Sequence, residues 1–157
     1  SDWSSDVCSS DLQNYLSADV LLVEDNPLDA ELTIRALKKQ GIANEIFCAI
    51  DGEEALNFIF CRDKFSERKN SQSLKVVLLD LKLPKIDGLE VLKEIKSRAE
   101  TSSIPVVILS SSKEDPDIKK AYSLGANSYV VKPVDFEDFV KAVQNTGLFW
   151  LLINEAP

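Results

Sequence analysis

The sequence contains no histidine and only three cysteines among its 157 residues. A chain without histidine cannot form a Ser-His-Asp triad or offer imidazole ligands to a metal. The cysteines, Cys8, Cys48 and Cys61, are too few and too widely spaced to predict a disulfide framework or a zinc site. Also missing are the roughly 18 consecutive apolar residues of a membrane-spanning helix and the basic start of a signal peptide. We therefore expect a cytoplasmic protein.

Basic residues are scarce relative to acidic ones, with 18 Lys and Arg against 26 Asp and Glu and a net charge of −8. An acidic surface repels phosphate backbones and anionic lipids, which argues against nucleic acid and membranes as partners. The same surface attracts divalent cations. The hydrophobic content of 45% suits one compact domain with a single core.

Residues 1–12 (SDWSSDVCSSDL) differ from the rest of the chain, because they are rich in serine and aspartate and show no apolar period. Residues 2–12 also resemble the in-frame translation of a common sequencing adaptor. A natural disordered tail is the alternative. We expect this segment to be non-native or disordered and to lie outside the fold.

From residue 19 onward, short apolar runs alternate with segments of helical period, which predicts an open α/β sheet with right-handed crossovers. The predicted strands span residues 20–23, 45–50, 74–79, 105–109 and 128–131. The predicted helices span 30–40 (with Gly41 as a C-cap) and 116–125, and three others begin near residues 51, 87 and 135. A polar loop is expected at 62–73.

Polar residues follow these strands at their carboxyl ends, where parallel sheets bind ligands. Glu24 and Asp25 follow the first strand, Asp80 the third, Ser110 the fourth and Lys132 the fifth. Each residue alone has an ordinary explanation as a helix cap, a loop residue or a solvated end. Together they predict three carboxylates, a hydroxyl and an ammonium at one edge of the sheet.

Such a set of groups suits phosphoryl transfer. Clustered carboxylates repel one another unless a cation lies among them, and ligation by oxygen alone favours Mg²⁺ or Mn²⁺. An aspartate carboxylate can act as the nucleophile and form an acyl phosphate. The lysine and the hydroxyl would stabilise the charge of the transferred group.

Four segments, in this order over about residues 19–146, resemble the signature blocks of the response-regulator receiver family: VLLVEDN, VVLLDLKLPKIDG, VVILSSS and GANSYVVKPVD. The resemblance implies a (βα)5 flavodoxin-like fold with strand order 2-1-3-4-5 and a receiver domain over residues 19–147. It also implies a two-component phosphorelay, in which Asp80 accepts a phosphoryl group from a histidine kinase or a histidine phosphotransfer protein.

The same resemblance implies the metal ligands. Asp25 and Asp80 would bind Mg²⁺ (or Mn²⁺) directly, Glu24 would act mainly through water, and the backbone carbonyl of Lys82 would be a further ligand. The side chain of Lys82 could shield the phosphoryl group or point to solvent, and the sequence does not decide between these.

The remaining family positions concern the conformational change that follows phosphorylation. Lys132 would pair with the phosphoryl oxygens, and Ser110 would swing inward to hydrogen-bond one of them. Tyr129 matches the aromatic that moves with Ser110, although it could equally be an ordinary sheet-edge aromatic. The Lys132–Pro133 bond matches one that is usually cis in the family.

Residues 148–153 (LFWLLI) are all apolar, and one face of an extended last helix could bury only about half of them. Together with residues 26–39 and the loop at 62–73, they resemble single-domain regulators that partner phytochrome-like kinases. That resemblance implies a homodimer through the last helix and residues 148–153, which lie within a C-terminal extension of that helix over 148–157. The alternative is an end that folds back onto its own domain.

The sequence argues against three other functions. A haloacid-dehalogenase-type phosphatase needs a second aspartate two residues after the nucleophile, where this chain has Lys82. A pseudo-receiver, which binds partners without being phosphorylated, is opposed by the complete acceptor set. A DNA-binding regulator would have a linker and further helices after the receiver domain, where this chain has the residues INEAP. We therefore expect no enzyme beyond one that catalyses its own phosphorylation and dephosphorylation.

Overall fold

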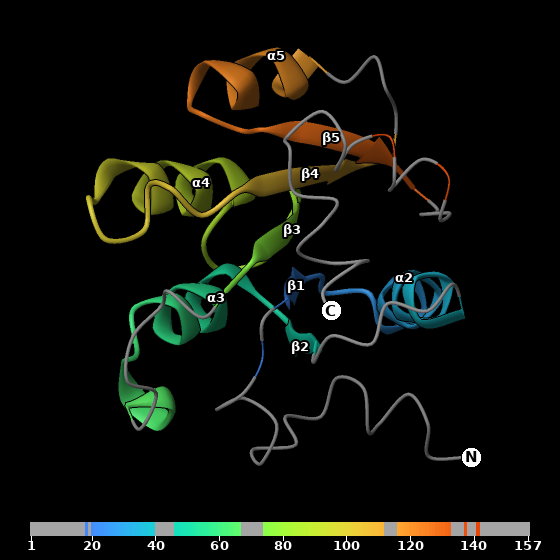
Figure 1. Ribbon diagram of the computed structural model, residues 1–157, viewed down its shortest axis with the longest axis horizontal. Coiled ribbons are helices and arrows are strands. Elements are labelled where there is room, and N and C mark those ends of the chain that lie inside the picture. Colours follow the sequence, from blue (N-terminus) through green and yellow to red (C-terminus); the bar gives the residue numbers. More distant parts are fainter. Residues whose placement is uncertain are drawn as a thin grey trace, which may run out of the picture.

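The computed structural model describes residues 18, 20–39, 46–66, 74–111 and 116–132, and the single positions 137 and 141. Within these residues, five parallel strands form one sheet in the order β2-β1-β3-β4-β5 (Figure 1). The strands are β1 (Val20–Val23), β2 (Ile46–Ala49), β3 (Val76–Asp80), β4 (Val106–Ser110) and β5 (Ser128–Val131). The strand order that the family resemblance implies is confirmed.

Helices follow the first four strands: α2 (Pro27–Lys39), α3 (Gly52–Ile59), α4 (Gly88–Ser97) and α5 (Pro116–Ser123). Figure 1 shows α3 and α4 on one side of the sheet and α2 on the other. In the described part of the chain, no helix is long and apolar enough to cross a membrane.

The core has two layers because successive side chains of a strand point to opposite faces. In β1, Leu21 and Val23 pack with α3, α4 and Ala121 of α5. Val20 and Leu22 pack with α2 on the other face. Helices on both faces explain why the strands are almost entirely apolar.

Helix α2 begins at Pro27, three residues before the predicted start. The side chain of Asn26 caps it, since Asn26 Oδ1 accepts hydrogen bonds from the N–H groups of Leu28 (2.9 Å) and Asp29 (3.2 Å). Proline is favoured at the first helical position. The apolar period alone begins only at Ala30, so it missed the first turn.

The prediction of a polar loop at 62–73 is wrong at its start. Asp63–Phe65 forms a 3-10 turn, η2, that buries Phe65 completely. The ring of Phe65 lies edge-on to Phe58 and Phe47, with centroids 5.2 and 5.4 Å away. Phe65 is therefore a core residue in a segment that otherwise reads as polar.

Several predictions fall outside the described residues. They concern residues 1–12, the C-cap at Gly41, the rest of the loop at 67–73, the Lys132–Pro133 bond and residues 148–157. Of the helix predicted from residue 135, the structure describes only positions 137 and 141, both helical.

Candidate functional site

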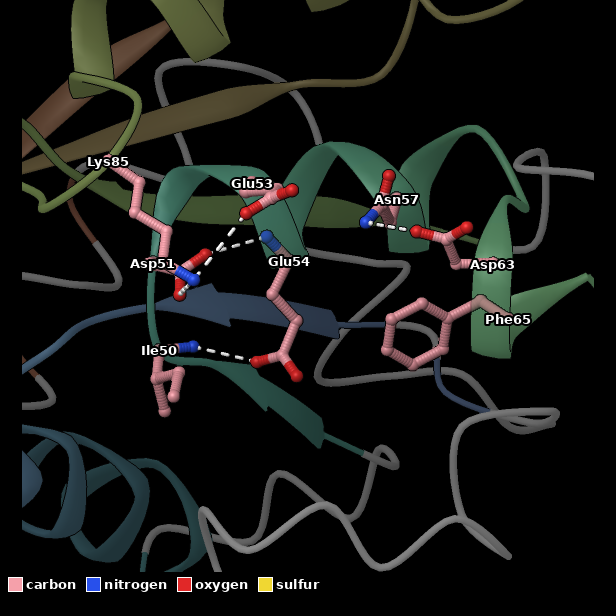
Figure 2. Close-up of a pocket in the computed structure, with 8 residues that line it drawn as sticks. All are labelled: Ile50, Asp51, Glu53, Glu54, Asn57, Asp63, Phe65 and Lys85. Carbon is pink, nitrogen blue, oxygen red and sulfur yellow. Dashed lines mark hydrogen bonds and ion pairs between the residues drawn. The ribbon is translucent and has the colours of Figure 1, made fainter.

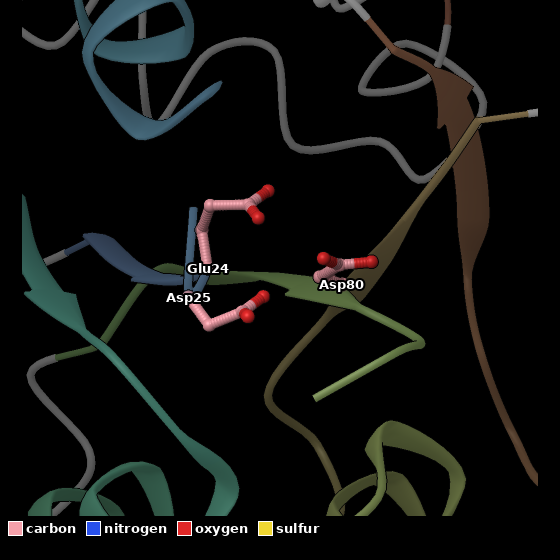
Figure 3. A group of neighbouring side chains, drawn as sticks. All are labelled: Glu24, Asp25 and Asp80. Carbon is pink, nitrogen blue, oxygen red and sulfur yellow. The ribbon is translucent and has the colours of Figure 1, made fainter. Parts of the chain in front are cut away.

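The carboxyl ends of β1 and β3 bring three carboxylates together. Val23 pairs with Leu79 in the parallel register, so the residues that follow each strand are neighbours. Single carboxylate oxygens of Glu24, Asp25 and Asp80 all lie within 4.8 Å of one another (Figure 3). Glu24 and Asp80 are buried, whereas Asp25 is exposed. The cluster is thus buried on one side and open to solvent on the other.

Lys132, directly after β5, reaches this cluster with its ammonium group. Its Nζ lies 3.1 Å from Glu24 Oε1, 3.2 Å from Asp80 Oδ2 and 3.2 Å from Asp29 Oδ2. The side chain of Lys132 is only 15% exposed. Its backbone N–H donates to Ser110 O at 2.7 Å, which ties the end of β5 to the end of β4.

The burial of opposite charges changes their protonation. Burial raises the pKa of Glu24 to about 7, the Asp80 carboxylate adds to this rise, and Lys132 opposes it. Burial alone would lower the pKa of Lys132, but the Asp80 and Glu24 carboxylates outweigh it and raise that pKa. The ammonium therefore stays charged, while the carboxylates are crowded.

The donor set fits a hard divalent cation. Glu24, Asp25 and Asp80 offer oxygen ligands only, which suits Mg²⁺ or Mn²⁺ rather than a softer metal. Two of the three clustered carboxylates, Glu24 and Asp80, share the single ammonium of Lys132. A cation near exposed Asp25 would supply the missing positive charge.

A small cavity of about 70 Å³ lies beside the acceptor candidate. Its lining comes from the ends of β3, β4 and β5 and comprises Asp80, Leu81, Lys82, Leu109, Ser110, Ser111 and Lys132. Ser110 is buried, with 3% exposure. The N–H of Lys82 donates to Asp80 Oδ1 at 3.3 Å, and Lys82 as a whole residue is exposed. The structure thus brings Asp80, Ser110 and Lys132 around one space.

Tyr129 lies on one face of β5 and is partly buried. It packs against the core layer that contains α3 and α4, and its ring is edge-on to Tyr122 of α5 at 6.3 Å. Ser110 shares that face, because Tyr129 pairs with Ile108, two residues before Ser110. The two predicted switch residues are therefore neighbours on one face.

Close backbone packing explains the glycine after Asp87. A Cβ atom on Gly88 would overlap the backbone carbonyl oxygen of Asp80 and the backbone of Leu81. The N–H of Gly88 also donates to Leu81 O at 3.0 Å. The start of α4 is thereby packed directly against the backbone of the acceptor candidate.

The sequence reasoning missed Asp29, the third carboxylate on Lys132. A signal was present, because α2 follows β1 after a short turn and its first turn must lie at the same edge of the sheet. An acid in that turn could therefore reach the residue that follows β5. The contact joins residues 103 positions apart in the chain.

A larger cavity of about 380 Å³ lies at the start of α3 and is lined mainly by polar residues (Figure 2). Lys85 Nζ lies 3.6 Å from Asp51 Oδ2 and 3.5 Å from Glu53 Oε1. Asp51, and then Glu53, raise the pKa of Lys85. The Asp51 side chain also caps α3 by accepting from the N–H of Glu54 at 2.7 Å.

Comparison with known proteins points to one family. A family model described as the response regulator receiver domain matches residues 20–144. A solved structure of the bacteriophytochrome response regulator AtBRR is 51% identical, covers 87% of this chain and 96% of its own, and has a TM-score of 0.79.

Two further relatives are response regulators as well. Response regulator Rcp1 of Synechocystis sp. is 39% identical over 132 residues, 84% of this chain and 88% of Rcp1. The structure of the Mn²⁺-bound form of Rcp1 is 35% identical, covers 88% of this chain and 96% of its own, and has a TM-score of 0.68. The structure of the phosphorylated cyanobacterial phytochrome response regulator RcpA is 34% identical, covers 88% and 95%, and has a TM-score of 0.67.

Proposed function

The chain belongs to the response regulator receiver family of two-component systems, and from this we propose that Asp80 accepts a phosphoryl group from a histidine kinase or a histidine phosphotransfer protein. The observation that carries the proposal is the position of Asp80. Its carboxylate lies 3.2 Å from Lys132 Nζ, shares a carboxylate cluster with Glu24 and Asp25, and borders a cavity lined by Ser110.

In the proposed reaction, an oxygen of Asp80 attacks the phosphorus of a phosphohistidine. The new P–O bond forms as the P–N bond breaks, and the imidazole nitrogen leaves with the electron pair and takes a proton from solvent. Lys132 pairs with one phosphoryl oxygen and the hydroxyl of Ser110 donates to another. The chain thus catalyses its own phosphorylation, and attack of water on the phosphorus of the acyl phosphate later releases inorganic phosphate and restores the Asp80 carboxylate.

We propose Mg²⁺ or Mn²⁺ as the cofactor, held by Asp25, Asp80 and the backbone carbonyl of Lys82, with Glu24 acting through water. When bound, the ion neutralises charge on the transferred phosphoryl group. The all-oxygen donor set supports this, as do two related structures, the Mn²⁺-bound form of Rcp1 and phosphorylated RcpA.

Signalling is proposed to pass through Ser110 and Tyr129. Ser110 would move toward the phosphoryl oxygen, and Tyr129 would follow inward, changing the surface around β5 and α5 that a protein partner reads. Their position on the same face of neighbouring strands supports this coupling. The phytochrome-linked names of AtBRR and RcpA favour a phytochrome-like histidine kinase as the upstream partner.

We also propose that the chain forms a homodimer through the last helix and residues 148–153. Its support is the apolar run at 148–153. Deleting residues 148–157 should shift the mass measured by sedimentation equilibrium from that of a dimer toward that of a monomer. An unchanged mass would rule out this interface.

The test of the function is phosphorylation by acetyl phosphate in the presence of Mg²⁺. Intact mass and a phosphate-affinity gel should show one added phosphoryl group, which EDTA and Asp80→Asn abolish. Asp51→Asn is the matched control, because it removes a buried carboxylate at the other cavity and should leave the modification intact. A wild-type chain that stays unmodified would instead support the pseudo-receiver, an interaction module that is never phosphorylated.

A further inference from the structure

The ammonium of Lys132 has three carboxylate partners, and one of them, Asp29, comes from α2. A lysine ammonium has three N–H donors and no acceptor. Glu24, Asp29 and Asp80 lie at 3.1, 3.2 and 3.2 Å, so together they occupy all three donors. Lys132 therefore has no donor left for a phosphoryl oxygen unless one partner is given up.

Stabilisation of the helix N-terminus does not account for the direction of the Asp29 side chain. Asp29 is the third residue after the cap Asn26, the position from which an acid accepts from the N–H of the cap residue. In this structure the N–H of Asn26 donates to Glu24 Oε2 at 3.2 Å. The Asp29 carboxylate is instead directed to Lys132.

The three partners differ in what their release would cost. The side chain of Asp29 is 34% exposed, against 1% for Glu24 and 7% for Asp80. A carboxylate that is already partly in water loses little when its ion pair opens, whereas a buried one is left uncompensated. Asp29 is therefore the partner that Lys132 can leave most easily.

We propose that Asp29 is a positioning residue that holds Lys132 in the unphosphorylated chain and is exchanged for an oxygen of the phosphoryl group on Asp80. This inference rests on the proposed function of Asp80. Asp29 also places a negative charge near the site that an anionic phosphodonor must approach. Both effects slow phosphorylation, so Asp29 sets how readily the chain responds to its donor.

The first measurement compares phosphorylation rates with acetyl phosphate at saturating Mg²⁺. Asp29→Asn should react about three- to tenfold faster than wild type, because it removes a charge close to the reacting groups. Asp29→Glu keeps the charge and should react at the wild-type rate. Glu31→Gln removes the same charge from the same helix, where it pairs with Arg35 at 3.3 Å, and should also react like wild type.

The second measurement separates the hold on Lys132 from simple charge removal. Urea unfolding of the unphosphorylated chain should give non-additive effects for Asp29→Asn and Lys132→Gln, because the two side chains contact each other. Glu31→Gln combined with Lys132→Gln should be additive. Additive effects for the Asp29 pair would overturn the proposed hold even if Asp29→Asn reacted faster.

The outcomes separate the two proposals. If wild type is phosphorylated but Asp29→Asn reacts at the rate of Glu31→Gln, the role of Asp29 is overturned and the role of Asp80 stands. If wild type is not phosphorylated, and Asp80→Asn gives the same result, both proposals fail.

Discussion

Two lysines in this structure lie among carboxylates, and they behave differently. Lys132 is 15% exposed and lies 3.1 Å from the buried carboxylate of Glu24. Lys85 is 61% exposed and lies 3.6 and 3.5 Å from Asp51 and Glu53. Around Lys132, burial raises the pKa of Glu24 to about 7. Around Lys85, water screens the same kind of pairing.

The two clusters also differ in the cavities that they line. The Lys85 cluster lines a cavity of about 380 Å³, whereas the Lys132 cluster borders one of about 70 Å³. Groups whose charges interact strongly, because little water separates them, are the ones that can steer a reaction. We therefore expect the two clusters to respond very differently to substitution.

The largest effect should come from the apolar wall of the larger cavity, at Phe65. This ring is fully buried and contacts Phe47 and Phe58. Phe65→Ala should lower the free energy of unfolding by about 3–5 kcal/mol, measured by urea denaturation, because it leaves a void among aromatic rings. Phe65→Leu, which keeps most of the volume, should lose clearly less. A loss for Phe65→Ala below about 1 kcal/mol would mean that the ring does not anchor η2.

The next largest effect should come from Lys132. Lys132→Met leaves Glu24 and Asp80 crowded without their cation and should cost about 3 kcal/mol of unfolding free energy in EDTA. Added Mg²⁺ should recover part of this loss, because it supplies positive charge to the same carboxylates. If Lys132→Met is as stable as wild type in EDTA, burial does not distinguish the two clusters.

Adding Mg²⁺ should have a smaller effect on stability, and this effect should distinguish the Lys132 cluster from the Lys85 cluster. A ligand that binds only the folded state at about a hundred times its Kd stabilises it by about 2.7 kcal/mol. Mg²⁺ should therefore raise the urea midpoint of wild type and of Asp51→Asn, but not that of Asp25→Asn. A loss of the Mg²⁺ effect in Asp51→Asn would place the cation at the larger cavity instead.

Much of the Lys132 cluster could be predicted from the sequence, whereas the Lys85 cluster was not, and particular residues show why. Apolar runs ending in polar residues placed Glu24, Asp80 and Lys132 at strand ends, and a parallel sheet brings such ends together. Phe65 was missed because one aromatic in a polar segment gives no period to recognise. Asp29 was missed because its contact with Lys132 depends on how α2 lies against the sheet.

The smallest effect is expected at Lys85. Lys85→Met should change neither the urea midpoint nor the phosphorylation rate measurably, since its ion pairs are screened by water. The loop that carries Lys85 is held by backbone packing instead. A Cβ atom on Gly52 would overlap the carbonyl oxygen of Ile86, and the N–H of Gly52 donates to Pro84 O at 3.4 Å.

Gly52→Ala provides the matched comparison for that loop. It should push the loop between β3 and α4 away from α3 and thereby disturb the carbonyl of Lys82, lowering the apparent Mg²⁺ affinity measured by the shift in urea midpoint. Lys85→Met should leave that affinity unchanged. If Lys85→Met instead weakens Mg²⁺ binding as Gly52→Ala does, the exposed ion pairs position the loop. The two lysine clusters would then be parts of one site rather than two independent clusters.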